Sequence, residues 1–296
     1  MKNTIAILGA GVLWGTMGIF SRVLSGFGLK PVHITAFRLV SATIVLIILS
    51  AFMGGKKNYK IKASDLKWFI MSGVFSIAGI TICYFNSITL SSLSTAAILL
   101  YTAPVFVTII SYFVFNERIT PMKVMALISA ILGCVLVTGI DGKITTIGVL
   151  WGIGSGIAYA LYSIFGTILL KRYSTFQVTL ISFVIGTIAI LPFSDIEGIV
   201  KIVSAAENKI LLISVCALSG IITAVLPYML YTYGLKGTIP GKASIMASIE
   251  PVVATLNGII FFDEPFGFTS FIGIAFVILA VMLINNFGRT SNNRNI

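Results

Sequence analysis

Long apolar segments separated by short polar connectors make up almost the whole chain. Each segment is close in length to the roughly 20 apolar residues that a helix needs to cross a bilayer core about 30 Å thick. The pattern therefore predicts ten membrane-spanning helices and no separate soluble domain. The ten segments cover residues 4–24, 31–53, 66–88, 93–115, 119–139, 147–170, 176–193, 209–234, 240–262 and 268–287.

Two connectors are longer than the others. Residues 54–65 form a basic loop, and residues 194–208 have the pattern of a short surface helix. We expect Ser194 to cap that helix, because a serine hydroxyl accepts a hydrogen bond from a free N–H in the first turn. Its apolar positions recur at helical spacing on one face and are Ile196, Ile199, Val200 and Val203.

The composition is that of an integral membrane protein. Of the 296 residues, 57% are hydrophobic and 10% are charged, and the mean hydropathy is +1.06. Soluble domains carry about 25% charged residues, so this chain lacks the polar surface that a soluble globule needs. A net charge of +11 could indicate nucleic-acid binding, but the basic residues lie in short connectors and form no patch among stacking aromatics. We therefore expect the lipid bilayer, and no nucleic acid, as a partner.

The distribution of basic residues predicts the orientation. With the N-terminus in the cytoplasm, the cytoplasmic connectors hold most of the 20 Lys and Arg residues, and Arg38 lies inside the second segment. Because such an excess marks the cytoplasmic side, we expect a multi-pass protein of the plasma (inner) membrane with both termini in the cytoplasm. The outer connectors hold only Arg22, Lys30, Lys143, Lys201 and Lys209.

The chain resembles itself at an offset of 147 residues. At this offset Pro104 matches Pro251 and Glu117 matches Glu264, so both halves keep a proline and a glutamate 13 residues apart. Each half holds five segments, and because five is odd the second half must cross the membrane in the opposite orientation. We predict an all-α membrane protein of ten helices in two inverted five-helix repeats around a central cavity. The two repeats cover residues 1–142 and 143–296.

The pentapeptide GVLWG occurs twice, but its two copies are not equivalent positions. The copies at Gly11–Gly15 and Gly148–Gly152 are offset by 137 residues. An offset of 145, much closer to that of the repeat, instead pairs Trp14 with Tyr159 at similar depth in their segments. Trp151 is then expected in the outer aromatic belt. The shared glycines are expected to form small-residue ridges on which helices approach closely.

Together these features resemble the EamA-type drug/metabolite transporter superfamily. The resemblance covers essentially the whole chain, and its most specific part is the phrase IEPVVATLNGIIFFDEPF at Ile249–Phe266. The pattern around Trp14-Gly15 and the phrase from Pro104 to Glu117 add to it. The resemblance implies a ten-helix bundle with a central cavity. It also implies transport, often export, of small metabolites such as amino acids, nucleosides or related compounds.

Glu250 is the most informative single residue. It lies about ten residues into its segment, which is about 15 Å deep at the helical rise. A carboxylate at this depth costs several kcal/mol unless it is paired or hydrated, so we expect it to face the bundle interior. It either binds a substrate amine or carries a proton, or it braces two helices through an ion pair or hydrogen bond. Asn257 lies two turns further on the same face.

Arg38 is the natural counter-ion, about 10 Å below the outer surface. Its guanidinium either reaches toward Glu250 or a substrate carboxylate, or snorkels to the outer headgroups. Pro104 and Pro251 are expected to shape or hinge helices in both halves. Five aromatic residues lie several positions from the nearest interface and either line a cavity or simply pack: Trp14, Tyr84, Tyr101, Tyr159 and Tyr228.

Enzymatic chemistry finds little support in the sequence. The single histidine, His33, lies near an outer interface, and the three cysteines fall inside apolar segments without metal-ligand spacing. There is no Walker loop and no H-E-x-x-H motif. We therefore expect no catalytic residue, no metal site, no cofactor and no ATP-driven pump within this chain.

The sequence thus predicts a secondary transporter of small organic metabolites, an exporter in first interpretation, that works by alternating access. Amino acids or similar zwitterions are the first candidates for its cargo, because Glu250 and Arg38 could bind the two charges of such a molecule. Protons are a candidate coupling ion. Two alternatives stay open: import of nucleoside-like or other metabolites, and a membrane scaffold or sensor without transport.

Overall fold

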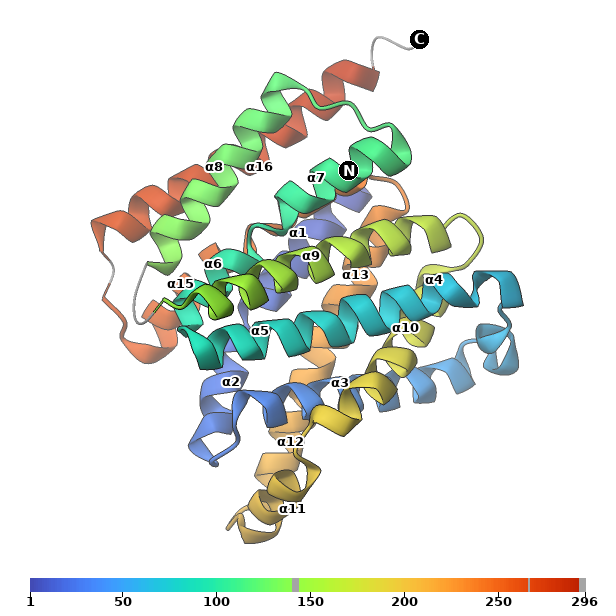
Figure 1. Ribbon diagram of the computed structural model, residues 1–296, viewed down its shortest axis with the longest axis vertical. Coiled ribbons are helices and arrows are strands. Elements are labelled where there is room, and N and C mark those ends of the chain that lie inside the picture. The colour runs from blue at the N-terminus through green and yellow to red at the C-terminus, as the bar shows by residue number, and fades with distance from the viewer. Residues whose placement is uncertain (140–143, 266, 293–296) are drawn as a thin grey trace.

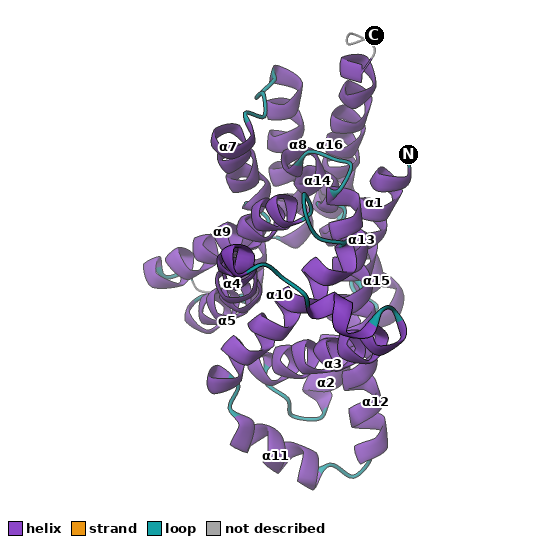
Figure 2. Ribbon diagram, turned by 90° about the vertical axis from the view of Figure 1, so that its right-hand side faces the viewer, coloured by secondary structure: helices purple, strands orange, loops and turns teal. Residues whose placement is uncertain are grey.

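The computed structural model describes residues 1–139, 144–265 and 267–292, with side chains described up to residue 285. All regular structure in these ranges is helical (Figure 2). Ten helices, some of them interrupted, are long and apolar enough to cross a membrane. The prediction of an all-α membrane protein with ten spans is confirmed.

The first five spans follow one another with short connections. The basic loop after the second span contains two 3₁₀ turns, η1 (Gly55–Tyr59) and η2 (Ala63–Asp65). The spans themselves are α1 (Lys2–Gly15) with α2 (Met17–Gly26), α3 (Pro31–Phe52), α4 (Leu66–Ile70) with the π-helix η3 (Met71–Ala78) and α5 (Gly79–Leu90), α6 (Leu93–Leu100) with α7 (Ala103–Phe115), and α8 (Pro121–Thr138).

The second five spans have the same plan, and the connector after the second of them forms the surface helix α11 (Ile196–Ala205) that the sequence predicts. The spans are α9 (Thr146–Leu169), α10 (Thr175–Ile190) with the 3₁₀ turn η4 (Leu191–Phe193), α12 (Lys209–Gly220) with the π-helix η5 (Ile221–Val225) and α13 (Leu226–Leu235), α14 (Pro240–Ala247) with α15 (Glu250–Phe262), and α16 (Phe268–Asn292).

Helix boundaries repeat at the same offset as the sequence. Both ends of α6 and of α7 lie 147 residues before those of α14 and α15, and α8 begins 147 residues before α16. The two π-helices end at positions with the same offset, Ala78 and Val225. The proposed repeat boundary at 142/143 lies outside the described residues. The opposite orientation of the two halves stays a prediction.

The helices form one bundle with α1 and α9 near its middle (Figure 1). α8 and α16 pack along each other at one edge, α5 packs on α9, and α13 packs on α1. Both termini lie at the same end of the molecule in Figures 1 and 2. Segments far apart in sequence therefore meet through long helix–helix contacts, as a bundle of spans requires.

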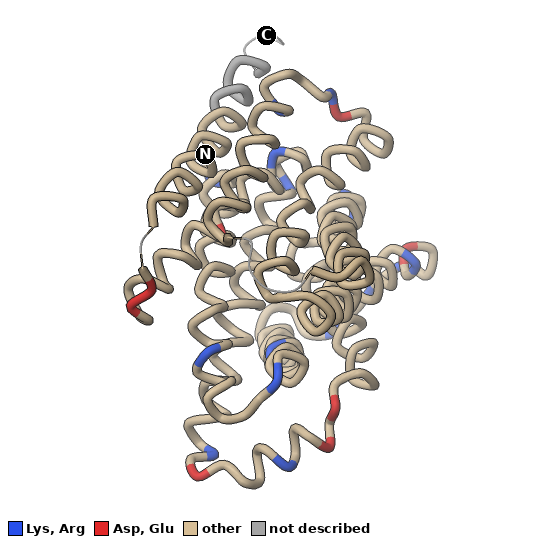
Figure 3. The backbone as a smooth tube through the Cα atoms, turned by 60° about the vertical axis from the view of Figure 1, so that its left-hand side comes forward, with Lys and Arg blue, Asp and Glu red and all other residues tan. Residues whose placement is uncertain are grey.

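Charged residues gather at the helix ends and in the connectors (Figure 3). The long uncharged stretches between them expose large apolar side chains, among them Ile44, Ile48, Met125 and Ile128. Such an apolar exterior is unfavourable in water and favourable against lipid tails. The molecule is an integral multi-pass membrane protein.

The cap of α11 differs from the sequence prediction. Asp195, with a positive φ of 46°, accepts the hydrogen bond from the Gly198 backbone N–H at 3.2 Å. Ser194 is instead buried and donates to the Ile190 carbonyl at 2.8 Å, so its prediction as the cap is wrong. A hydrogen bond of 2.9 Å between Asp195 and His33 ties α11 to the start of α3. This bond, together with that from Gly198, holds the pKa of Asp195 below its usual value.

We predict that Gly273→Ala destabilises the α8–α16 contact. A Cβ at this position would lie 2.7 Å from a Val137 methyl and 2.9 Å from the Gly133 carbonyl oxygen. Overpacking of this kind costs about 1–3 kcal/mol. The measurement is thermal unfolding of the purified protein in detergent. Gly18→Ala is the control, because a Cβ there meets nothing within 4 Å. An equal loss in both variants would contradict the close helix contact.

Candidate functional site

Two spans are broken at equivalent places in the middle of the bundle. α6 gives way to α7 at residues 101–102, and α14 gives way to α15 at residues 248–249. Pro104 and Pro251 lie in the first turns of α7 and α15. A proline fits there, since the first N–H groups of a helix have no intrahelical partner and φ is already near the helical value. The two prolines therefore begin half-helices and do not kink continuous ones.

Glycines of α1 and α9 lie directly against these breaks. A Cβ at Gly15 would come within 2.8 Å of the Glu250 carbonyl oxygen, and one at Gly11 within 3.0 Å of the Ala247 carbonyl oxygen. On α9, a Cβ at Gly156 would come within 2.9 Å of the Leu99 carbonyl oxygen. Only helices that lack side chains at these positions can lie this close to the broken backbone.

Glu250 lies at the start of α15 and forms the centre of the candidate site. Its carboxylate lies within electrostatic range of Arg38 on α3 and close to Tyr101. No ion pair joins Glu250 to Arg38 in the described part of the chain. A carboxylate in the first turn of a half-helix is stabilised by the free N–H groups and the helix dipole.

Arg38 has fewer partners than its chemistry requires. A guanidinium carries five N–H donors. Among the described residues it makes one hydrogen bond, from Nη1 to the Met17 sulfur at 2.9 Å, and its buried Nε has no partner there. Sulfur is a weak acceptor, so this bond satisfies little of the guanidinium's hydrogen-bonding capacity. The guanidinium lies within electrostatic range of Tyr228, Glu250 and Tyr84.

An aromatic cluster around Trp14 lies beside Arg38 and Glu250. The Trp14 ring packs against Tyr159 at 6.0 Å between centroids, against Tyr228 at 5.3 Å and against Tyr231 at 5.4 Å. Trp14 and Tyr159 are thus in direct contact, whereas their equivalence in the repeat stays a prediction. The second pentapeptide tryptophan, Trp151, is 37% exposed and lies in the second turn of α9.

Several of these side chains are partly accessible although they belong to the interior of spans. The residues concerned are Arg38, Tyr84, Tyr101, Tyr159 and Glu250, whereas Trp14 and Tyr228 are buried. Polar groups that are accessible at this depth require water or a ligand beside them, because lipid offers no hydrogen bonds. The arrangement is suited to holding a small molecule that carries both a cationic and an anionic group.

Asn257, the other polar residue predicted for the site, has a partner within the protein. Its amide Nδ2 donates to the Gly15 carbonyl at 3.1 Å and so braces α15 against α1. In the structure it therefore serves the same helix contact as the glycines.

Sequence reasoning missed three neighbours of the site. Met17 accepts from Arg38, Cys134 on α8 lies within electrostatic range of Glu250, and Tyr231 completes the aromatic cluster. The Tyr231 hydroxyl bonds the Ser163 hydroxyl at 2.8 Å and is therefore already occupied. Tyr231 could have been found from the repeat, because the offset of 147 pairs it with Tyr84. Nothing in the sequence distinguishes Met17 or Cys134 from ordinary packing residues.

Comparison with known families gives a match over nearly the whole chain. The profile of the EamA-like transporter family matches residues 1–139 and again residues 146–286. The chain is thus similar to two successive copies of one family domain. Each matched range contains one of the two broken spans, and the second contains Glu250.

The curated relatives extend over the same length. An uncharacterized transporter of Clostridium kluyveri is 24% identical, with 99% of this chain and 96% of the relative covered. One from Archaeoglobus fulgidus is 27% identical, with 94% of each chain covered. The uncharacterized inner membrane transporter YicL of Salmonella typhimurium is 26% identical, with 96% of this chain and 95% of the relative covered.

A solved structure shares the fold. It superimposes with a TM-score of 0.78 at 19% sequence identity and covers 98% of this chain and 99% of its own. Its title, "Crystal structure of protein", gives no activity, and at this identity the likeness shows the fold alone.

We predict that Trp14→Ala costs far more stability than Trp151→Ala. Removing a buried tryptophan leaves a cavity and costs about 3–5 kcal/mol. Trp14 is 7% exposed among three tyrosine rings, whereas Trp151 is 37% exposed at a helix end. The measurement is thermal unfolding of the two purified variants. It compares tryptophans that occupy the same position in two identical pentapeptides. A similar loss in both would show that Trp14 does not anchor the cluster.

Proposed function

This chain belongs to the EamA-like transporter family, and we propose from that premise that it is a secondary transporter of small zwitterionic metabolites, amino acids first among them. The family expected from the sequence is confirmed, and membership indicates a transporter and not an enzyme. The cargo, the direction and the mechanism are the proposal. Alternating access around the centre of the bundle is the mechanism that two broken spans and an internal repeat support best.

One observation carries the proposal: Arg38 and Glu250 lie within electrostatic range of each other, and no ion pair joins them among the described residues. A structural pair would be closed, because separated buried charges cost more than paired ones. A zwitterion supplies what both lack. Its carboxylate would accept from the free Arg38 donors, and its ammonium group would donate to Glu250. Trp14 and Tyr159 lie beside them and offer the side chain of the cargo an apolar and aromatic wall.

The proposed setting is the plasma membrane of a prokaryote, with both termini in the cytoplasm and export as the direction. The excess of Lys and Arg in the connectors expected on the same side as the termini supports this orientation. A bacterial relative named an inner membrane transporter supports the location.

We predict that Glu250→Gln and Arg38→Gln each reduce the flux of labelled amino acids in proteoliposomes by about tenfold or more. Each change removes one charge-assisted hydrogen bond to the cargo, of the kind worth about 1.5–3 kcal/mol. Initial rates of uptake and efflux of a panel of labelled amino acids, measured at equal amounts of reconstituted protein, test the prediction.

Glu197→Gln is the matched control for the loss of a carboxylate. Glu197 lies exposed on α11 and pairs only with Lys201, at 2.6 Å. It should transport as the unsubstituted protein does. Undiminished flux in Glu250→Gln would remove this carboxylate from the mechanism. If the unsubstituted protein moves no zwitterion but does move a nucleoside-like compound, the alternative cargo is correct. No flux with any metabolite would favour a scaffold or sensor.

We also predict proton coupling through Glu250. An imposed pH gradient should then make the unsubstituted protein accumulate its cargo above equilibrium, because each cycle returns a proton down its gradient. Glu250→Gln, which carries no proton, should only equilibrate the cargo. The measurement is the steady-state concentration ratio across the vesicle membrane with and without the gradient. Equilibration without accumulation in the unsubstituted protein would indicate facilitated diffusion.

A further inference from the structure

Two glutamates are held by the same backbone turn at the ends of α7 and α15. Each helix ends on a left-handed residue, Asn116 with φ 54° and Asp263 with φ 52°. The glutamate that follows donates its backbone N–H six residues back, Glu117 to Ser111 and Glu264 to Gly258, both at 3.2 Å. The backbones of the two turns are therefore equivalent, and only the side chains have different surroundings.

The Glu117 carboxylate is buried and joins three helices. Its Oε1 accepts from the Lys123 ammonium group on α8 at 2.5 Å, and both side chains are 4% exposed. Its Oε2 accepts from the backbone N–H of Gly241 at 3.3 Å, in the first turn of α14. A Cβ at Gly241 would meet Lys123 and Glu117. Glu117 thus fastens the end of α7, in the first half of the chain, to the start of α14, in the second.

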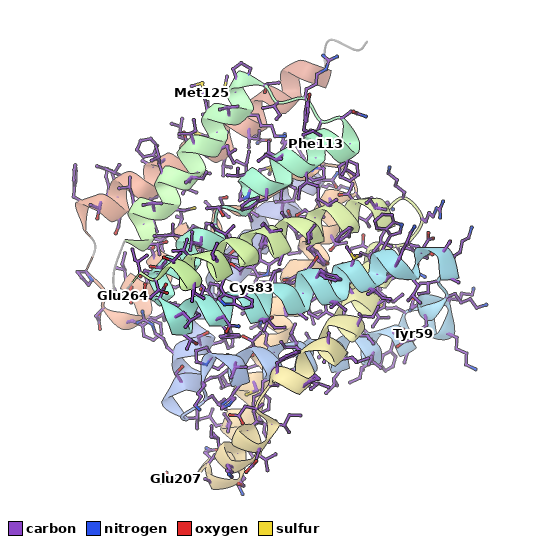
Figure 4. The ribbon with its side chains drawn as sticks, viewed as in Figure 1. Tyr59, Cys83, Phe113, Met125, Glu207 and Glu264 are labelled. Atoms are coloured by element: carbon purple, nitrogen blue, oxygen red, sulfur yellow. The ribbon has the colours of Figure 1, made fainter. Side chains whose placement is uncertain are left out.

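This contact lies at the end of the molecule that holds the termini. The segment that leads into α14 passes the start of α1, since a Cβ at Gly237 would meet the Asn3 side chain. The other end of the molecule is different. Glu264 lies there, opposite Phe113 near the end of α7 (Figure 4). Its carboxylate is 41% exposed and pairs with the half-exposed Arg22.

We propose that Glu117 and Glu264 close the two ends of the transport path in turn, which we call alternating closure. Each glutamate fastens one end, and the two do so in opposite states of the transport cycle. In the state seen here Glu117 closes the end with the termini. In the other state Glu264 leaves Arg22 and caps the start of α6 near Ser94, the position 147 residues before Gly241. Both are positioning residues, because they act through α14 and α6 and do not touch the cargo. The inference rests on the proposed alternating access.

Helix packing supports a closed end and an open end. α14 packs closely on α7, whereas no comparable packing joins their counterparts α6 and α15 among the described residues. Two hydroxyls on α7, those of Thr108 and Ser111, are buried and have no hydrogen-bond partner among the described residues. Unpaired buried hydroxyls are unfavourable in a permanently dry interface, and opening of this end would hydrate them. The matching residue of Thr108 on α15, Thr255, is already partly accessible.

The two closures differ in how hard they are to break. Separation of a buried ion pair leaves two charges that need water, so opening at Glu117 must come with hydration of that end. The Arg22–Glu264 pair is exposed, and solvent and salt weaken it. The state with Glu117 engaged is therefore the one that the empty protein favours. The two turns have equivalent backbones but different side-chain partners. Together they would let the protein exist in two states, which alternating access requires.

The experiment measures thiol labelling by a membrane-impermeant maleimide on protein in nanodiscs, where both faces are accessible. Thr108→Cys reports on the closed end and Thr255→Cys on the open end. The unsubstituted chain, whose three cysteines lie within spans, gives the background. Adding Glu117→Gln should raise labelling at position 108 by about tenfold and lower it at position 255, because the two-state equilibrium shifts. Glu264→Gln should neither raise labelling at position 108 nor lower it at position 255.

Gly241→Ala is a second, milder way to open the same contact, since its methyl group displaces Lys123 and Glu117. It should shift labelling in the same direction as Glu117→Gln, and Ser94→Ala at the matching position should not. A merely structural role would lower the melting temperature without opposite changes at positions 108 and 255. Unchanged labelling in folded Glu117→Gln and Gly241→Ala would overturn the inference. The readout needs no substrate, so a failure of the proposed function would appear separately, as absent flux with labelling still shifted.

Discussion

Broken helices in the middle of a bilayer are possible only where other protein covers the interrupted backbone, and the rest of this structure depends on that cover. Lipid tails cannot satisfy the polar groups freed at a break. Here α1 and α9 provide the cover by close approach. Gly15 lies against the Glu250 carbonyl and Gly156 against the Leu99 carbonyl, and Asn257 bonds back to Gly15. The break between α14 and α15 therefore depends on the close packing of α1 against it.

That constraint determines where charge can be placed. Because α15 begins at the break, Glu250 occupies the first turn of a half-helix, where a carboxylate is favoured. Arg38 enters from α3 and stays short of partners. In surroundings of low dielectric constant each charge acts strongly on whatever enters between them. Tyr159, Tyr228 and Tyr231 pack around Trp14 nearby, so these rings hold one another in place.

The two halves share several backbone features, and they differ in a few side chains at the candidate site and at the helix ends. Both halves have a π-helix, a broken span and a left-handed turn before a glutamate. Only one half has the carboxylate at its break, since Ala103 stands at the position that matches Glu250. Of the two glutamates that follow these turns, only Glu117 is buried against a lysine. This combination of matching turns and unequal contacts is the basis of the alternating closure that we propose.

The sequence by itself determined the ten spans, the all-helical fold and the offset of 147, and it indicated Glu250 and Arg38 as candidate site residues. These follow from chemistry that is local or repeated along the chain, since a span is a run of apolar residues and a buried charge stands out within it.

The sequence did not determine the cap of α11. Asp195 caps this helix in place of the expected Ser194, and His33, 162 residues away, bonds the aspartate. Only the tertiary structure decided that Arg38 meets Met17 and forms no ion pair with Glu250, that Asn257 serves Gly15, and that Glu117 is buried while Glu264 is exposed. Each of these depends on which helices lie side by side, and a pattern of apolar residues fixes the length of a helix but not its neighbours.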